Sequence, residues 1–288
     1  MTSHSPASRA LNDALLQEVI ASYARTEDAR WNTVAESLLR HLHAFVNETG
    51  LTPPEWFAAI DFLTRTGKTC VGPRQEFILL SDALGISSAV DNIHNASSPG
   101  ATESAVTGPF YAPGSPDVEH GASIALAGEG ERVLITGSVR SVDGEPIAGA
   151  ILDIWHTAPN QLYAVQDSTQ PEMNFRGRLR SRGDGTFAFT TLKPTFYPVP
   201  VDGPVGSLLT LAGRHPMRPA HIHFTVTAPG FRSLTTQMYT RGDPYIDSDA
   251  VFGVKPSLLV DYIPVSDAAS DLRWTLDHEF VLDREDGA

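Results

Sequence analysis

The chain has 288 residues, of which 41% are hydrophobic and 19% charged, a composition that is typical of a folded globular protein and excludes a largely disordered one. Its formal net charge of −13 argues against general nucleic-acid binding, which needs Lys and Arg to neutralise phosphates. No apolar run approaches the roughly 20 residues that span a bilayer, Cys70 is the only cysteine, and the N-terminus lacks a secretory-signal layout. We therefore expect a cytoplasmic protein that acts on small molecules.

The first third of the chain predicts helices. Between residues 10 and 96 apolar side chains recur at a spacing of three or four, as in Leu11, Leu15, Leu16, Val19 and Ile20. Thr52 stands before two prolines and Glu55, a pattern that is typical of a helix start. Residues 75–84 are amphipathic, and Gly85 after them favours a helix end. These patterns predict an all-helical domain over residues 1–100.

Short β-branched runs dominate the remainder. They cover residues 133–139, 150–155 and 186–190. The dipeptides Asp143-Gly144 and Asp184-Gly185 lie between them and favour tight hairpin turns, because glycine tolerates positive φ. We therefore expect a mostly antiparallel β-sandwich over residues 101–288, and an α+β protein as a whole.

A His-x-His pair is the sharpest local feature of the sequence. In a strand, His221 and His223 would share one face, with Ile222 packed behind them. The pair fits either a metal site or two hydrogen-bonded histidines on a half-buried strand. A zinc or copper site would recruit Cys, another His or a carboxylate, but the next acidic residue is Asp243. Tyrosine is the remaining candidate ligand, and Fe(III) is an ion that would keep its phenolate ionised.

Several motifs in one order carry a resemblance over nearly the whole chain. They are residues 108–111, residues 153–156 leading to Tyr163, residues 185–187 leading to 194–200, residues 213–215, and residues 218–224. With these motifs the chain resembles the intradiol ring-cleaving dioxygenases, the family of catechol, chlorocatechol and hydroxyquinol 1,2-dioxygenases.

The resemblance implies one non-haem Fe(III) per chain and cleavage of an aromatic diol by O2 between its two hydroxyl carbons. The implied metal ligands are Tyr163, Tyr197, His221 and His223. The implied catalytic residues are Arg218, which would stabilise charge on the ring, Tyr197, which would accept a proton on leaving the metal, and Gln237. The helical domain resembles the linker domain of the family, which implies a homodimer and a phospholipid at its interface.

Within the family, residues 62–70, 74–82, 108–111 and 249–255 look most like hydroxyquinol 1,2-dioxygenases. This implies benzene-1,2,4-triol as substrate and 3-hydroxy-cis,cis-muconate, or its tautomer maleylacetate, as product. By the same resemblance Asp82 would accept a hydrogen bond from the third ring hydroxyl. The expected substrate-binding residues are Leu79, Asp82, Thr107, Gly108, Pro109, Phe110, Val199, Pro200, Arg218 and Val251.

Three alternatives stay open at this point. The same reaction could act on catechol or a chlorocatechol. The sandwich could be a transthyretin-like or carbohydrate-binding module in which the tyrosines pack and bind no metal. A zinc hydrolase is the third alternative, although no further nitrogen or sulfur ligand lies near the His-x-His pair in the sequence.

Overall fold

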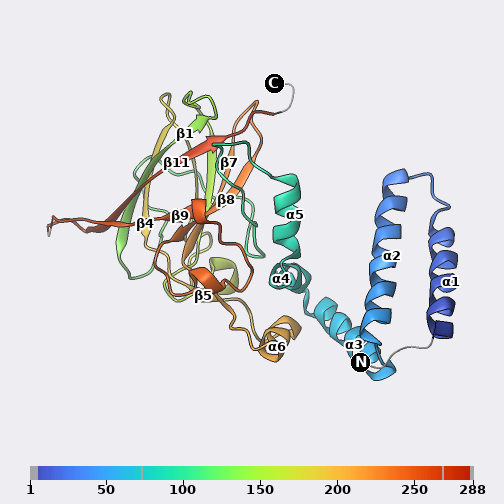
Figure 1. Cartoon of the computed structure of the whole chain (residues 1–288). Coiled ribbons are helices and arrows are strands. Elements are labelled where there is room, and N and C mark those ends of the chain that lie inside the picture. Colours follow the sequence, from blue (N-terminus) through green and yellow to red (C-terminus); the bar gives the residue numbers. More distant parts are fainter. Residues whose placement is uncertain (1–5, 73, 268, 286–288) are drawn as a thin grey trace. The chain divides into compact units, whose positions relative to one another are not determined.

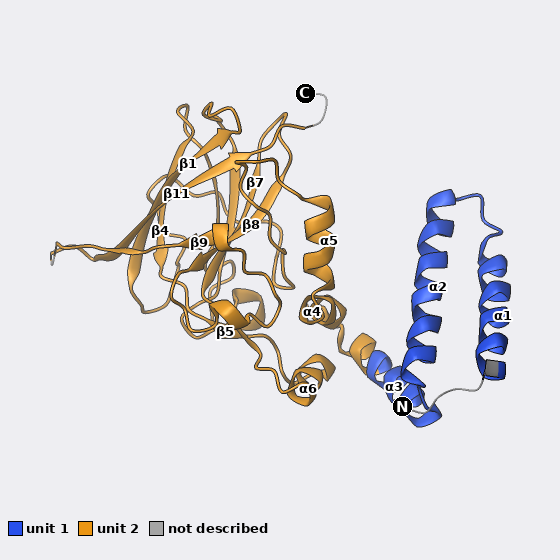
Figure 2. Cartoon of the chain, in the orientation of Figure 1, with its two compact units in different colours: residues 1–64 blue, residues 65–288 orange. Residues whose placement is uncertain are grey.

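The computed structural model describes residues 6–72, 74–267 and 269–285. The chain divides into two compact units, residues 1–64 and residues 65–288, and the division falls inside one helix (Figure 2). The prediction of a boundary near residue 100 differs from this division and stays a prediction. The helices and strands described below belong to one unit each, apart from that shared helix.

The first unit contains an antiparallel pair of helices and the start of a third. These are α1 (Pro6–Tyr23), α2 (Ala29–Thr49) and α3 (Pro53–Thr69). Asp28 caps α2 by accepting a hydrogen bond from the Trp31 N–H at 2.9 Å, and Gly50 ends it in the left-handed conformation. The Glu55 carboxylate accepts hydrogen bonds from the Thr52 N–H and hydroxyl at 2.8 and 2.7 Å. The predicted start of α3 is thereby confirmed.

The second unit begins with two short helices before the β-sheets. They are α4 (Glu76–Ala83) and α5 (Ile86–His94), and α6 (Pro204–Leu211) follows later in the chain. Gly85, with a φ of +74°, stands between α4 and α5 as the predicted helix stop. Glu76 is fully buried, and its Oε1 accepts a hydrogen bond from the Val205 N–H at 3.1 Å. This bond ties the first turn of α4 to the first turn of α6.

Two sheets face each other in the second unit (Figure 1). The four-stranded sheet has the order β10-β11-β1-β4, and the five-stranded sheet has the order β3-β2-β7-β8-β9. β5 and β6 form a separate two-stranded pair. The strand bounds are β1 (Arg132–Ser141), β2 (Ile151–Trp155), β3 (Arg176–Arg180), β4 (Thr186–Leu192), β5 (Tyr197–Pro198), β6 (Met217–Arg218), β7 (His221–Thr227), β8 (Leu234–Thr240), β9 (Leu259–Val260), β10 (Ile263–Pro264) and β11 (Leu272–Leu282).

Most strand pairs are antiparallel, whereas β1 with β11 and β8 with β9 are parallel. The predicted α+β class and mostly antiparallel sandwich are confirmed. The two predicted tight turns exist, and Gly144 and Gly185 have positive φ. The turn at Gly144 closes a short hairpin, because Arg140 and Pro146 form an antiparallel bridge across it. Each turn joins strands of different sheets, because β1 and β4 lie in one sheet and β2 and β3 in the other.

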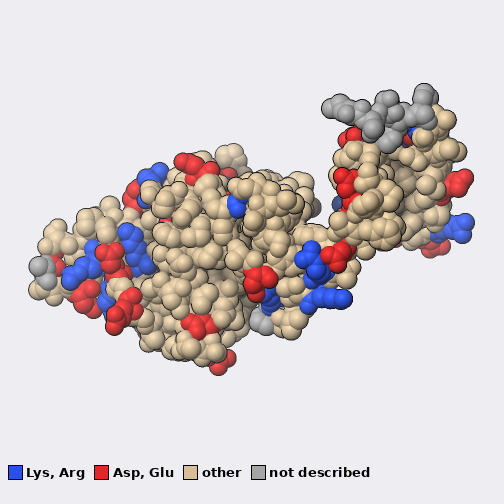
Figure 3. Space-filling view, turned by 90° about the horizontal axis from the view of Figure 1, so that it is seen from below, with Lys and Arg blue, Asp and Glu red and all other residues tan. Residues whose placement is uncertain are grey.

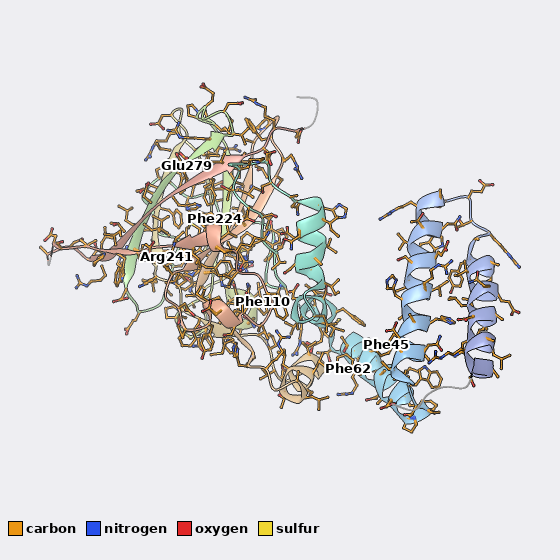
Figure 4. All side chains as sticks on the ribbon, viewed as in Figure 1. Phe45, Phe62, Phe110, Phe224, Arg241 and Glu279 are labelled. Atoms are coloured by element: carbon orange, nitrogen blue, oxygen red, sulfur yellow. The ribbon has the colours of Figure 1, made fainter. Side chains whose placement is uncertain are left out.

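The hydrophobic core lies between the two sheets. Alternate residues of each strand point into it, as Ile222 and Phe224 of β7 do opposite Phe189 of β4 and Phe280 of β11. Figure 4 labels Phe224 in this core. Because Ile222 and Phe224 point into the core, the alternating residues His221 and His223 must lie on the other face of the five-stranded sheet.

None of the helices in the described part of the chain is long and apolar enough to cross a membrane. On the face seen in Figure 3, Lys and Arg side chains are interspersed with Asp and Glu. The described residues of that face therefore present no continuous basic stripe of the kind that tracks phosphates. The prediction that the protein does not bind nucleic acid stays a prediction.

Candidate metal centre and substrate pocket

The candidate metal centre begins with the alternation of side chains along β7. His221 and His223 are each 2% exposed and lie on the face of the sheet that points away from the core. The Nδ1 of His221 lies 2.7 Å from the Pro219 carbonyl oxygen, which can only accept, so Nδ1 carries the proton. The lone pair of His221 therefore sits on Nε2, which lies 3.1 Å from the Nε2 of His223.

Neighbouring strands place further polar and aromatic side chains on the same face. Trp155 of β2 and Gln237 of β8 stand on either side of His223 in register, and Tyr239 of β8 stands beside His221. The Trp155 indole stacks on the His223 imidazole, with ring centroids 4.7 Å apart and planes 7° apart. The rotation of His223 is thereby fixed by packing.

Two tyrosines reach the histidines from outside the sheet. Tyr163 caps a short 3-10 turn (Ala164–Gln166), and its backbone N–H donates to the Gln166 side chain at 3.0 Å. Tyr197 lies in β5, where its register partner is Arg218 of β6. Both tyrosines are almost fully buried, and their rings meet edge to face with centroids 5.3 Å apart. The structure thus brings together all four residues that the resemblance implied as ligands.

The spacing of the four donor atoms fits a single metal ion. The Tyr163 Oη lies 3.2 Å from the Tyr197 Oη and 3.1 Å from the His223 Nε2, and the two Nε2 atoms are 3.1 Å apart. Donor atoms that share one ion at bond lengths near 2 Å stand about 3.3 Å apart in a tetrahedral arrangement. Buried polar atoms gathered at this spacing, with their ring planes held by packing, suit an ion of oxygen and nitrogen preference.

The protonation states of the donors favour a strongly charged ion. Burial raises the pKa of the Tyr163 phenol well above its usual value of 10, and burial also raises the pKa of Tyr197. Burial lowers the pKa of His221 and His223 well below 6.5, so both imidazoles are neutral at physiological pH. Neutral imidazoles are ready to ligate, whereas buried phenols need a nearby highly charged cation to ionise.

The zinc-hydrolase alternative has no support in this geometry. Among residues 6–72, 74–267 and 269–285, no three His, Cys, Asp or Glu side chains come together as a possible metal site. Asp243, the first acidic residue after the histidines, instead accepts a hydrogen bond from the Ala220 N–H at 3.0 Å. The two tyrosines are therefore the oxygen donors that the site offers.

Arg218 lies directly beside the four donor atoms. Its side chain is buried, and its Nη1 lies 3.4 Å from the Tyr197 Oη and 3.1 Å from the His221 Nε2. Gln237 is also buried, and its Oε1 accepts a hydrogen bond from the Arg218 Nη2 at 3.1 Å. The three predicted catalytic residues Arg218, Tyr197 and Gln237 are therefore contiguous.

A pocket of about 490 Å³ opens next to the tyrosines. Its wall is mainly apolar, and its charged residues form one ion-pair cluster of Arg74, Glu76 and Asp202. Five predicted substrate-binding residues line it, namely Leu79, Pro109, Phe110, Val199 and Pro200. The Phe110 ring, labelled in Figure 4, stacks on the Tyr163 ring with centroids 4.9 Å apart. The pocket therefore shares a wall with the candidate metal centre.

The other predicted substrate-binding residues lie outside the lining of this pocket. Thr107 is exposed, whereas Gly108 lies so close to the metal centre that an added Cβ would be 3.7 Å from His223 Cε1. Val251 is buried, and its N–H donates to Asp249 at 3.2 Å. Asp82 is 2% exposed, and its Oδ2 has no hydrogen-bond partner among the described residues. Burial raises the pKa of Asp82, while a Ser87 hydrogen bond and the charge of Arg218 lower it.

Sequence reasoning missed three functional neighbours of the site. Asp249 forms a buried ion pair with Arg218, and Tyr239 contacts the same guanidinium at 3.0 Å. Arg176 is fully buried and donates to the Phe110 carbonyl at 2.6 Å. Tyr239 could have been found from the sequence, because it lies two residues after Gln237 on β8 and therefore faces the same side of the sheet. Asp249 and Arg176 reach the site through tertiary contacts.

Comparisons with known proteins find relatives over nearly the whole chain. Residues 106–284 match the family described as "Dioxygenase", and residues 28–102 match "Catechol dioxygenase N terminus". The chain is 46% identical to 6-chlorohydroxyquinol 1,2-dioxygenase of Cupriavidus pinatubonensis, over 93% of this chain and 96% of the relative. It is 35% identical to catechol 1,2-dioxygenase of Candida albicans, over 96% and 93% respectively.

A solved structure is similar to nearly the whole chain. The crystal structure of hydroxyquinol 1,2-dioxygenase from Pseudomonas putida DLL-E4 has a TM-score of 0.89 and 46% identity, covering 96% of this chain and 100% of the other. With the two family matches and the convergent tyrosines and histidines, the chain belongs to the family of intradiol ring-cleaving dioxygenases.

Proposed function

We propose that the protein binds one Fe(III) through Tyr163, Tyr197, His221 and His223 and opens benzene-1,2,4-triol with O2. The bond between the two vicinal hydroxyl carbons is cleaved, both oxygen atoms enter the product, and 3-hydroxy-cis,cis-muconate, or its tautomer maleylacetate, is formed. The observation that carries this proposal is the convergence of four buried donor atoms, each of which lies 3.1 or 3.2 Å from at least one of the others.

The bound iron would act as a Lewis acid that draws electron density from the diol and makes the ring reactive toward O2. Tyr163, His221 and His223 would hold it throughout, while Tyr197 would leave and take a proton from a substrate hydroxyl. Tyr197 suits this role because its Oη lies 3.4 Å from the Arg218 Nη1. The positive guanidinium would stabilise the negative phenolate oxygen of Tyr197 until that oxygen takes the proton.

Arg218 would compensate the negative charge that develops on the ring oxygen. Its guanidinium is always charged and already faces the donor atoms, so no reorganisation is needed when the charge appears. Gln237 supports this position, because its Oε1 accepts from Arg218 and its side-chain amide donates to the Val106 carbonyl. Both residues are buried, which strengthens their electrostatic effect on a bound ring.

The preference for the triol is proposed from Asp82 and the pocket wall. Leu79 and Asp82 are three residues apart on α4 and therefore share one helix face. Leu79 lines the pocket. Asp82 has a buried Oδ2 without a hydrogen-bond partner among the described residues, and this oxygen would accept a hydrogen bond from the third ring hydroxyl. The higher identity to the chlorohydroxyquinol and hydroxyquinol enzymes than to the catechol enzyme supports the same choice.

A substrate panel tests this proposal. Iron-loaded protein is supplied with benzene-1,2,4-triol, catechol and 4-chlorocatechol, and the ring-opened products are identified by mass. We expect the highest kcat/KM for the triol. A clear preference for catechol would overturn the substrate, and turnover of none of the three by protein with a full iron content would overturn the reaction.

We propose that the first unit forms a homodimer and that its apolar surface can hold a phospholipid chain. On α2, large apolar side chains are exposed at a helical spacing, namely Trp31, Val34, Leu38, Leu42 and Phe45. Figure 4 labels Phe45 on this helix. An exposed stripe of this kind marks a surface that another apolar partner covers.

Light scattering on the purified protein tests the dimer, and extraction followed by mass spectrometry tests the lipid. Leu38→Glu should give a monomer, whereas Arg40→Glu, on the opposite side of the same helix, should leave the dimer intact. A wild-type monomer would exclude the dimer, and an extract free of phospholipid would exclude the lipid.

We also propose a cytoplasmic location, supported by the free thiol of Cys70.

A further inference from the structure

The guanidinium of Arg218 divides its donors between two sides. On one side Nε lies 3.1 Å from Asp249 Oδ1, and Nη2 lies 3.1 Å from Asp249 Oδ2. On the other side Nη1 faces the Tyr197 Oη and the His221 Nε2. Because a guanidinium is planar and rigid, a carboxylate that grips one edge fixes the direction of the other.

Asp249 is itself held in place. It is 5% exposed, and besides the two bonds from Arg218 it accepts hydrogen bonds from the N–H groups of Val251 and Gly253 at 3.2 and 3.0 Å. An ionised carboxylate has about four acceptor positions, and in Asp249 four donors occupy them. Its orientation is therefore determined by the backbone on one side and by Arg218 on the other.

The turn of residues 249–253 closes tightly over the guanidinium. An added Cβ at Gly253 would lie 2.9 Å from the Arg218 Nη2 and 2.6 Å from the Tyr239 Oη. Phe252 has a φ of +56°, a strained value for a bulky residue that persists when its surroundings enforce it. Arg214 helps to hold this turn, because its Nη2 donates to the Ala250 carbonyl at 2.8 Å and its guanidinium lies 4.5 Å from the centre of the Phe252 ring.

We propose that Asp249 is a positioning residue, which acts on ring opening by setting the place and direction of the Arg218 guanidinium. This inference rests on the proposed function of Arg218. Asp249 also offsets the positive charge of Arg218, which would otherwise oppose a cation held by the adjacent histidines. In addition, the Asp249 Oδ1 accepts hydrogen bonds from both the Arg218 Nε and the Val251 N–H, and the resemblance assigns Val251 to the substrate pocket.

A double-mutant cycle tests the inference through a quantity that a general loss of stability does not reproduce. The variants are Asp249→Asn, Arg218→Gln and both together, each loaded with iron and assayed per bound iron. The double variant removes both charges, so it avoids the uncompensated buried charge that destabilises each single variant. Asp249→Glu, which keeps the charge, should partly restore turnover.

We expect Asp249→Asn to lower kcat roughly 10- to 100-fold, as loss of a supporting partner does elsewhere. KM should change much less, and the visible absorption band of the bound iron should stay in place because no ligand is altered. In the Arg218→Gln background, Asp249→Asn should cause no further loss. The matched control is Asp261→Asn, which breaks an exposed pair with Arg241 and should leave turnover unchanged.

The outcomes separate the two proposals. Wild-type turnover by Asp249→Asn, or the same fold loss in the Arg218→Gln background as in the wild type, would overturn the inference on Asp249 while the role of Arg218 stands. Wild-type turnover by Arg218→Gln would overturn the proposed role of Arg218 and with it the mechanism by which Asp249 acts.

Discussion

The Trp155 indole lies flat against the His223 imidazole, with centroids 4.7 Å apart and an angle of 7° between the planes. The two residues are register partners on β2 and β7, so the pairing of the sheet itself sets this contact. Stacking of this kind fixes the ring of a metal-binding histidine in the same way that a hydrogen bond to its second nitrogen does in other sites.

Replacing Trp155 by Phe should loosen His223 and weaken iron binding by roughly 10- to 100-fold. The measurement is the iron retained after dialysis against a graded series of chelator concentrations. Trp274→Phe is the matched control, since Trp274 lies on β11 and its indole N–H donates to Glu131 at 2.9 Å. Equal iron retention in both variants would show that the stacked indole does not orient the ligand.

Tyr163→Phe removes one proposed anionic ligand without changing the packing of the ring against Phe110. We expect the visible charge-transfer band of the iron-loaded protein to bleach or shift, because a phenolate-to-iron transition is lost. Tyr262→Phe, at a partly buried tyrosine that packs against the core between the sheets and contacts Lys193, serves as control. A spectrum that Tyr163→Phe leaves unchanged would remove Tyr163 from the ligand set.

Asp82→Asn should narrow the preference for the triol over catechol by roughly 10-fold, because a carboxyl oxygen that would accept a hydrogen bond from the third ring hydroxyl is exchanged for an amide. The measurement is the ratio of kcat/KM for the two substrates. Asp271→Asn, which alters an exposed ion pair with Arg132, should keep the wild-type ratio. If both variants keep it, Asp82 does not recognise the third hydroxyl.

Gly253→Ala should lower both stability and turnover. The added methyl group meets the Tyr239 hydroxyl and the Arg218 guanidinium at distances that real Cβ atoms do not adopt, so one of them must move. We expect a loss of about 1–3 kcal/mol in the free energy of unfolding, which is usual for an overpacked site. Gly183→Ala has open space around its Cβ and is the control. Wild-type turnover by Gly253→Ala would contradict the tight contact.

His156 should make the protein less stable as the pH falls below 6.5. Its Nδ1–H donates to the Thr157 carbonyl at 2.7 Å, and the Thr191 hydroxyl donates to its Nε2 at 2.8 Å, an arrangement that holds the neutral ring. Burial lowers the pKa of His156 to about 4. Between pH 6.5 and 4 the unfolded chain therefore binds a proton that the folded chain does not, and stability falls with falling pH.

The size of this effect is about 3 kcal/mol across that window. Urea unfolding at several pH values measures it, with His156→Gln for comparison. The variant should be less stable at neutral pH but should lose less stability on acidification. Parallel losses in both proteins would show that another group carries the pH dependence.

Parts of the site followed from local pattern, because the two-residue period of a strand is a property of the backbone. The shared face of His221 and His223, with Ile222 in the core behind them, could be predicted and is what the structure has. The helix boundaries at Thr52 and Gly85 were likewise local, since capping groups lie within a few residues of the helix ends that they satisfy.

Other parts could not follow from local pattern, because they depend on contacts between distant segments. Tyr163 and Tyr197 reach the histidines from a 3-10 turn and a two-residue strand, so the family resemblance supplied them as ligand candidates. Asp249 lies 31 residues from Arg218 and meets it through the fold. The turn at Gly185 was predicted correctly, but which sheet each flanking strand joins is decided by the packing of the whole sandwich.

The central claim is the ferric site of two tyrosines and two histidines, and the visible spectrum of the purified protein with a parallel iron determination tests it most directly. We expect about one iron per chain and a red-brown charge-transfer band from phenolate bound to Fe(III). A colourless protein that takes up no iron on reconstitution would contradict it.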